Sequence, residues 1–188
     1  MSCLRKSLSP EAEDPQHWMV ANFSKGKKKF IQFEKQHEDI LTKGEKLRIE
    51  LLNLVEKDAI SFEPLSKAYI LPSATEEDKI IKEKEMQKCL KDACSAPVET
   101  MVLVFEGINL HEELTDIASV TIISDIGVGV QLLKAALNSA YLNVIINVNS
   151  IKDDEYVNNI KRRAENLLID GNKKADEIWN RVLKILEG

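Results

Sequence analysis

A chain of 188 residues, of which 44% are hydrophobic, is long enough for one domain with a sizeable core. Its net charge of −5 excludes a general electrostatic attraction to nucleic acid or to an anionic membrane surface. Only 7 Gly and 5 Pro leave few turns, so the composition favours an all-α fold.

The cysteine pattern predicts a cytoplasmic protein. Cys3, Cys89 and Cys94 form no CxxC pair, and an odd number suits a reducing compartment better than a disulfide framework. The N-terminus has no continuous apolar run typical of a signal peptide. Cys89 and Cys94 are either a redox pair or, as we favour, buried thiols on a helix.

The N-terminal stretch divides into an arm and the start of a domain. Residues 1–15 are polar and aperiodic and contain two prolines, which predicts a flexible arm. Residues 16–188 are expected to form a single helical domain. Gly26 ends the tail of a first helix. The basic run that follows is either a solvated face or a mouth that attracts a carboxylate ligand, and it comprises Lys25, Lys27, Lys28 and Lys29.

The apolar period predicts one long helix over residues 28–69. Its stripe consists of His37, Ile40, Leu41, Leu47, Leu51, Leu54, Val55, Phe62 and Leu65. Asp58 falls on this stripe, because it lies two turns from both Leu51 and Leu65. Burying an ionised carboxylate is costly unless another group pairs with it. Asp58 is therefore either a functional acid or a structural one bonded to a neighbouring helix.

The next segment predicts a second helix interrupted by a proline. Leu71-Pro72 closes the first helix, and the spacing of Ser73 and Glu76 predicts a capping box. The helix that follows is expected to bend or restart at Pro97, which cannot donate a backbone hydrogen bond. Its apolar face continues towards Asn109, and residues 111–120 predict a short separate helix.

Residues 124–149 predict the central, mostly buried helix of a bundle. Ser124 is expected to cap its first turn, and Asp125 to meet the positive end of its dipole. Apolar residues surround two polar stripes, which are Gln131, Lys134 and Asn138, and Ser139, Asn143 and Asn147. A membrane span is the competing interpretation, and the lysine and amide side chains argue against it.

The last helix is predicted to begin at Lys152-Asp153-Asp154 and to reach Leu186. No strand alternation competes with helix except at 144–148, where the flanking period of 3.6 favours helix. The fold class is therefore all-α, an antiparallel helical bundle with long helices around a buried central helix. No phosphate-binding loop or zinc spacing is present, so no metal site is predicted.

Several of these stretches, in this order, resemble the family of formiminotetrahydrofolate cyclodeaminases and methenyltetrahydrofolate cyclohydrolases. Asp58 and Phe62 match the family's D-x-x-x-F pattern, and the resemblance spans about residues 19–187. The other matching pieces are Met19-Val20, Gly26-Lys27-Lys28, Phe30, Leu54-Val55, Leu71-Pro72, Thr75-Glu76-Glu77, residues 93–97, Ser124-Asp125 and residues 140–147.

The resemblance implies folate one-carbon chemistry in a dimeric helical bundle. The cyclodeaminase closes a 5,10-methenyl bridge on 5-formiminotetrahydrofolate and releases ammonia, whereas the cyclohydrolase opens that bridge with water. Both reactions need proton transfer at a tetrahedral carbon, which suits a carboxylate acting as general acid and base. Asp58 falls on the family's catalytic aspartate.

The resemblance also suggests substrate-binding residues and partners. Asn143 and Asn147 could orient the pterin or hold the long helix to its neighbour. Lys27 and Lys28 could receive the glutamate tail of the folate, including polyglutamylated forms. Further expected contacts come from Lys82, where the family often has Arg, and from Ser124 and Asp125. The resemblance implies a tetrahydrofolate substrate, no tightly bound cofactor, a homodimer and a formiminotransferase partner; neither nucleic acid nor a membrane is expected.

Besides Lys82, the chain departs from the family at two further places. The family begins with a glycine-rich loop of the type PGGGS, and nothing similar precedes Trp18. A Gly-Asn pair of the family is replaced by Ala118 and Ser119. An alternative therefore stands beside the enzyme: a non-catalytic helical homologue that acts as a folate-binding or protein-interaction module.

Overall fold

The computed structural model describes residues 33–188, which form long antiparallel helices joined by short connections. In chain order these are α2 (Glu34–Tyr69), α3 (Glu76–Ile117), the 3₁₀ turn η3 (Val120–Ile122), α4 (Ile123–Val148) and α5 (Asp154–Glu187). The prediction of an all-α helical bundle is confirmed. The expected arm of residues 1–15 and the basic run with Lys27 and Lys28 lie outside the described residues.

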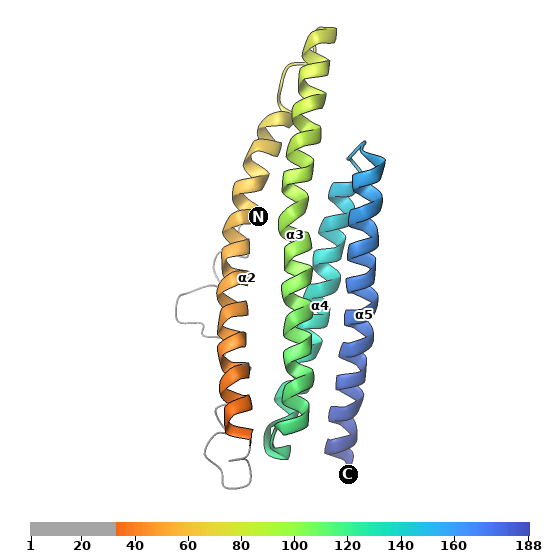
Figure 1. Cartoon of the computed structure of the whole chain (residues 1–188). Coiled ribbons are helices and arrows are strands. Elements are labelled where there is room, and N and C mark those ends of the chain that lie inside the picture. The colour runs from red at the N-terminus through yellow and green to blue at the C-terminus, as the bar shows by residue number, and fades with distance from the viewer. Residues whose placement is uncertain (1–32) are drawn as a thin grey trace.

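Helix α3 is the hub of the described bundle. It packs against α2 on one side and against both α4 and α5 on another, and α4 and α5 also pack together (Figure 1). The main core gathers apolar side chains of all four helices, among them Met101, Val130, Leu137 and Ile178. Gly171 of α5 faces Leu137 so closely that a Cβ there would collide with the leucine, which explains a glycine inside this helix.

Helix α3 runs without interruption through Pro97, so the predicted restart and the separate helix over 111–120 are wrong. Side chains sustain its second half: the His111 ring hydrogen-bonds through Nδ1 to the Gly107 carbonyl at 2.9 Å, and Thr115 Oγ1 donates to the His111 carbonyl at 2.7 Å. The capping box exists but lies two residues later than predicted, between Thr75 and Asp78.

Helix α4 has one buried face and one exposed face. Val130, Leu137 and Val144 are fully buried, whereas Leu132 and Ile146 are 63% and 68% exposed. Among residues 33–188, α4 is therefore not mostly buried, contrary to the expectation. Residues Val120–Val148 are the one stretch of the described chain that is long and apolar enough to cross a membrane, with 33% of the residues in its most apolar window buried.

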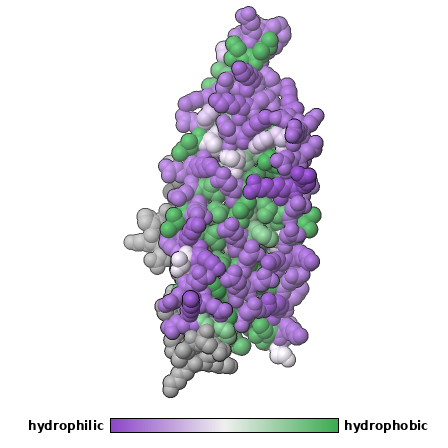
Figure 2. All heavy atoms as spheres, viewed as in Figure 1, coloured by the Kyte–Doolittle hydropathy of each residue, from purple (hydrophilic) through white to green (hydrophobic). Residues whose placement is uncertain are grey.

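The end of the bundle where α2 meets α3 projects beyond α4 and α5 (Figure 1). Apolar side chains are exposed there, with Ile70 at 83%, Ile80 at 68% and Ile81 at 58%. Elsewhere on the face shown in Figure 2 hydrophilic residues predominate, and apolar residues show mainly through the middle of the bundle. The short connection between these helices is fastened by Lys82, whose Nζ donates to the carbonyls of Tyr69 and Leu71.

Candidate functional site

Asp58 lies near the middle of α2, and its side chain is exposed. The expected burial of this carboxylate is therefore wrong for the single chain. Leu54 and Leu65 turn towards the core, while Val55 and Phe62 are 58% and 44% exposed. Asp58 stands at the border between these two sets. In the part of the chain that the structure describes, no hydrogen bond or ion pair engages its carboxylate, which leaves both oxygens open to a ligand.

Asp58 and Asn143 lie at the same height of the bundle. Lys57, next to Asp58, bonds to Glu99 of α3. On the other side of α3, Asn147 of α4 bonds to Ala93. Helices α3 and α4 run antiparallel (Figure 1). A step along α3 from Ala93 to Glu99 therefore corresponds to a step of about one and a half turns back along α4 from Asn147, which ends close to Asn143. Asn143 is exposed, so its amide is also available to a ligand.

Asn147 has a structural task. Its Nδ2 donates to the Ala93 carbonyl at 3.3 Å. In an unbroken helix that carbonyl would accept from the N–H four residues later, but Pro97 occupies that position and has no N–H. The Asn147 amide therefore replaces a hydrogen bond that the proline removes. Of the two roles considered for this residue, holding α4 to its neighbour is the one for which a contact exists.

The remaining predicted site residues are distant from Asp58 along the bundle. Lys82 lies about 24 Å along α3 from the level of Asp58 and caps the end of α2. Ser124 and Asp125 lie in the first turn of α4, about 28 Å from the level of Asn143. Ile122, not Ser124, occupies the N-cap of this helix and makes no side-chain cap. Those predicted site residues that lie within 33–188 therefore do not converge on one place within a single chain.

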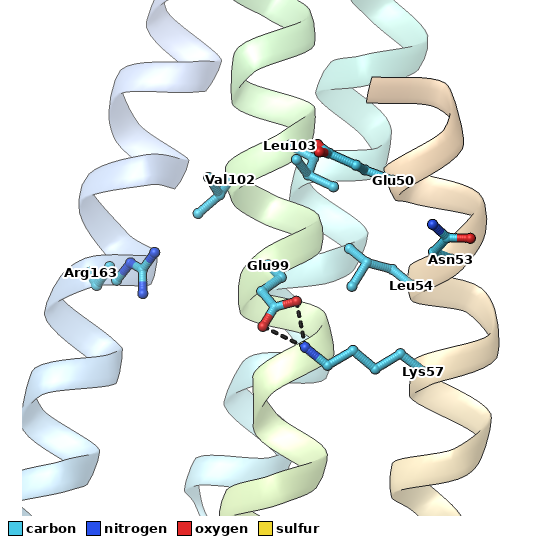
Figure 3. A pocket seen from close by; sticks show the side chains of 8 residues that line it. All are labelled: Glu50, Asn53, Leu54, Lys57, Glu99, Val102, Leu103 and Arg163. Atoms are coloured by element: carbon cyan, nitrogen blue, oxygen red, sulfur yellow. Dashed lines mark hydrogen bonds and ion pairs between the residues drawn. The ribbon is translucent and has the colours of Figure 1, made fainter. Parts of the chain in front are cut away.

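A cleft of about 380 Å³ lies between α2 and α3, and Lys57 lines it whereas its neighbour Asp58 does not. Lys57 reaches across from α2, and its Nζ contacts both carboxylate oxygens of Glu99 at 2.7 Å (Figure 3). Leu54, Val102 and Leu103 provide apolar surface, and Arg163 extends towards the cleft from α5. The sequence did not predict this cleft, because nothing in a single sequence fixes which residues of two helices lie opposite each other.

The charges of this cleft balance. Its rim carries the cations Lys57 and Arg163 and the acids Glu50 and Glu99. Lys57 is paired with Glu99, so Arg163 is the rim cation for which no ion pair is found among residues 33–188. Such a cleft has an apolar floor for a ring system but little net attraction for an anionic tail.

The described thiols are buried and free. Cys94 is fully buried, and this burial raises the pKa of its thiol to about 11. Burial also raises the pKa of Cys89. Neither forms a disulfide, so the interpretation as buried helical thiols is confirmed over a redox pair. Within residues 33–188, no group of three His, Cys, Asp or Glu side chains could hold a metal ion.

Comparisons with known proteins identify relatives over most of the chain. The family profile described as formiminotransferase-cyclodeaminase matches residues 17–166. A methenyltetrahydrofolate cyclohydrolase from Methylorubrum extorquens is 32% identical over 87% of this chain and 79% of its own length. A formimidoyltransferase-cyclodeaminase from Sus scrofa is 26% identical over 87% of this chain, which spans only 30% of that longer relative.

A solved structure has the same fold. The crystal structure of formiminotetrahydrofolate cyclodeaminase from Thermotoga maritima is similar with a TM-score of 0.74 and 28% sequence identity. The likeness covers 93% of this chain and 81% of the crystallised one. The arrangement of long helices around Asp58 and Asn143 is therefore shared with a protein of this class at nearly full length.

Proposed function

Because this chain belongs to the formiminotransferase-cyclodeaminase family, we propose that it is an enzyme of folate one-carbon metabolism. The favoured reaction is hydrolysis of 5,10-methenyltetrahydrofolate. The observation that carries this choice is the 32% identity to a cyclohydrolase of which the chain covers 79%. The second candidate is the cyclodeaminase reaction, which the likeness to the Thermotoga maritima structure supports.

Asp58 is the proposed general acid and base. In the hydrolysis, water adds to the methenyl carbon while Asp58 accepts a proton from it. The bond from that carbon to N5 then breaks as Asp58 returns this proton to N5. The hydroxyl group left on the carbon loses its proton to solvent and becomes the carbonyl of the formyl group, which stays on N10. In the cyclodeaminase reaction N10 attacks the carbon of the protonated formimino group, and the same carboxylate takes the proton from N10 and passes it to the amino group on that carbon. The bond from the carbon to this amino group then breaks, ammonia leaves, and the 5,10-methenyl bridge remains. The exposure of Asp58 supports access for a folate ring, and the cleft lined by the adjacent Lys57 offers apolar surface for it.

The partners follow from the same proposal. The substrate is a reduced folate, whose glutamate tail is assigned to Lys27 and Lys28, and no tightly bound cofactor is required. Asn143, at the height of Asp58, is the proposed contact of the pterin. The working form is a homodimer in the cytoplasm, and the longer relatives make a formiminotransferase the proposed partner if ammonia is released.

The test is turnover by the full chain and by Asp58→Asn. Methenyl-folate is followed by absorbance and ammonia release in parallel. Removing a general acid and base is expected to lower kcat/KM by about 100-fold or more. The thermal midpoint is expected to stay unchanged because Asp58 is exposed.

Glu56→Gln is the matched control, since Glu56 is another exposed acid on the same helix, and its turnover is expected to equal that of the wild type. If Asp58→Asn keeps full activity, the assigned role is wrong. If the wild type neither turns over nor binds a reduced folate, the non-catalytic homologue is the correct interpretation.

A further inference from the structure

Helix α5 faces α3 with a row of cations that pair with acids of α3. Lys174 pairs with Glu112 at 2.6 Å, and Arg181 pairs with Asp116. Arg163 lies on the same side of α5, because it precedes Lys174 by about three helical turns. Within the described helices Arg163 is the exception in this row: its guanidinium extends towards the cleft, and no hydrogen bond or ion pair engages it (Figure 3).

The register of the two helices identifies the acid that stands opposite Arg163. Helices α3 and α5 run parallel (Figure 1), and contacts near both ends of the pair join residues that are 62 or 65 positions apart. The same separations place residues 98–101 opposite Arg163, and Glu99 is the acid in that stretch. Glu99 is engaged from the other side, since Lys57 Nζ contacts both of its carboxylate oxygens at 2.7 Å. The ion pair between α2 and α3 therefore occupies the acid that Arg163 would otherwise bind.

The nearest positions of α5 supply no acid to Arg163 either. Side chains three and four positions apart are neighbours on a helix. Around Arg163 these positions are uncharged, and they are Asn159, Ile160, Asn166 and Leu167. The adjacent Arg162 differs, since Glu165 lies three positions further on. The second acid of the cleft, Glu50, contacts Lys46 at 3.7 Å.

The guanidinium of Arg163 stands beside an apolar floor in the cleft. This floor consists of Leu54, which is 8% exposed, and the half-buried Val102 and Leu103. Apolar side chains of this kind suit a flat ring, and a guanidinium binds a carboxylate through two parallel hydrogen bonds. A ligand that fits the cleft therefore has an aromatic ring with one carboxylate close to it.

We infer that the cleft binds the aminobenzoyl-glutamate part of a reduced folate, with the ring on the apolar floor and the glutamate carboxylate nearest to the ring on Arg163. The inference rests on the proposed function for the identity of the ligand. It assigns a place to a part of the substrate that lies away from the reacting carbon. Lys57 lines the cleft and directly precedes Asp58, so the cleft adjoins the helical turn of the proposed acid. Further carboxylates of a polyglutamylated tail stay assigned to Lys27 and Lys28.

The first experiment measures binding of para-aminobenzoyl-L-glutamate to the full chain by isothermal titration calorimetry. Arg163→Gln is expected to raise the dissociation constant about 10-fold, since charge-assisted hydrogen bonds to the carboxylate are lost. Arg162→Gln is the matched control, because Arg162 is also exposed on α5 but lines a different hollow, and its affinity is expected to equal that of the wild type. Circular dichroism verifies that both variants keep their helices. Unchanged affinity of Arg163→Gln, or a wild type that does not bind the fragment at millimolar concentration, overturns the inference.

The second experiment tests whether Arg163 acts on the carboxylate itself. In the α-amide of the same fragment, the carboxylate nearest to the ring is replaced by a neutral group. The wild type is expected to bind this amide about 10-fold more weakly than the acid, whereas Arg163→Gln is expected to bind the two ligands equally. If Arg163→Gln distinguishes the ligands as strongly as the wild type does, the arginine acts only through the fold and the inference is wrong.

The ion pair of Lys57 with Glu99 provides a third test. Lys57→Gln releases Glu99, which then pairs with Arg163, so this variant is expected to bind the fragment as weakly as Arg163→Gln does. Adding Glu99→Gln removes the competing acid and is expected to restore the affinity of the wild type. A double variant that stays weak would make Lys57 the cation that binds the carboxylate and would overturn the assignment to Arg163.

Turnover of methenyl-folate separates this inference from the proposed function. Arg163→Gln is expected to raise KM about 10-fold and to leave kcat unchanged, because the carboxylate is bound equally in the ground state and the transition state. Binding of the fragment by a chain without turnover contradicts the proposed chemistry alone. Turnover in which Arg163→Gln has the KM of the wild type contradicts the inference alone.

Discussion

His37 is fully buried near the start of α2, at the end of the bundle away from the projecting hairpin. Burial of the imidazole lowers its pKa from the ordinary 6.5, and the backbone of Phe33 offsets part of this effect. The unfolded chain therefore binds a proton at His37 at a higher pH than the folded chain does. Above about pH 7.5 the titration of His37 does not change the free energy of unfolding. As the pH falls through 6.5 towards the folded-state pKa, it lowers that free energy.

We expect His37→Gln to flatten this pH dependence. Between pH 7 and pH 5 the wild type should lose up to about 1.4 kcal/mol of unfolding free energy for each pH unit that separates the two pKa values. The variant lacks this loss, although a buried amide lowers its stability at every pH. Urea unfolding at several pH values provides the measurement. Equal slopes for the two proteins would mean that His37 does not stay neutral in the folded state.

The exposure of Asp58 shows that the helical period alone does not predict whether a side chain is buried. The helical period correctly places it close to Leu54 and Leu65, which are buried. The same period places it close to Val55 and Phe62, which are exposed. Periodicity gives the direction of a side chain around its own helix, whereas burial depends on a neighbour, and among the described helices α2 packs mainly against α3.

At the scale of elements, the contact of Asn147 with Ala93 makes a proline compatible with an unbroken helix. Sequence reasoning expected α3 to bend or restart at Pro97, because the proline removes one hydrogen bond. The missing donor comes from α4, more than fifty residues away in sequence. A tertiary contact of this kind is not visible in the sequence around the proline. The sequence therefore predicted that helical structure forms here, but not that one helix continues through Pro97.

This arrangement predicts a coupling between the two residues. Asn147→Ala should lower the unfolding free energy by about 1 kcal/mol, since the Ala93 carbonyl loses its donor. In a Pro97→Ala background the same change should cost clearly less, because residue 97 then supplies an N–H to that carbonyl. Urea unfolding of the four proteins at one concentration measures the coupling.

Asn143→Ala is the control for that cycle, because Asn143 lies one turn away on the same helix and is exposed. Its cost is expected to stay within about 0.5 kcal/mol in both backgrounds. An identical cost of Asn147→Ala with and without Pro97 would refute the compensation, and Asn147 would then be free for a role at the ligand.

For the whole molecule, composition and period were enough to predict an all-α bundle and the ends of most helices. Helix α5 begins at Asp154, within the predicted stretch, and α2 ends before Leu71-Pro72 as predicted. The burial of α4 was not predictable in the same way. Its apolar residues lie on two sides of the helix. The sequence alone does not distinguish whether the second side packs against another part of the same chain or against another molecule.

The unequal packing of the helices predicts unequal stability within the bundle. Helix α3 is held by α2, α4 and α5, whereas α2 is held mainly by α3 among the described helices. Opening α2 therefore breaks fewer apolar contacts than opening α3 does, and local opening is easiest where such contacts are few.

We expect amides of α2 over residues 52–64 to exchange with deuterium faster than those of α3 over residues 101–114. Hydrogen exchange followed by mass spectrometry of peptic peptides measures both segments in one experiment, with the buried half of α5 as a reference. Equal protection of α2 and α3 would show that the bundle opens only as a unit, and that the exposed apolar side chains of α2, Val55 and Phe62, are covered in solution by a partner that the single chain lacks.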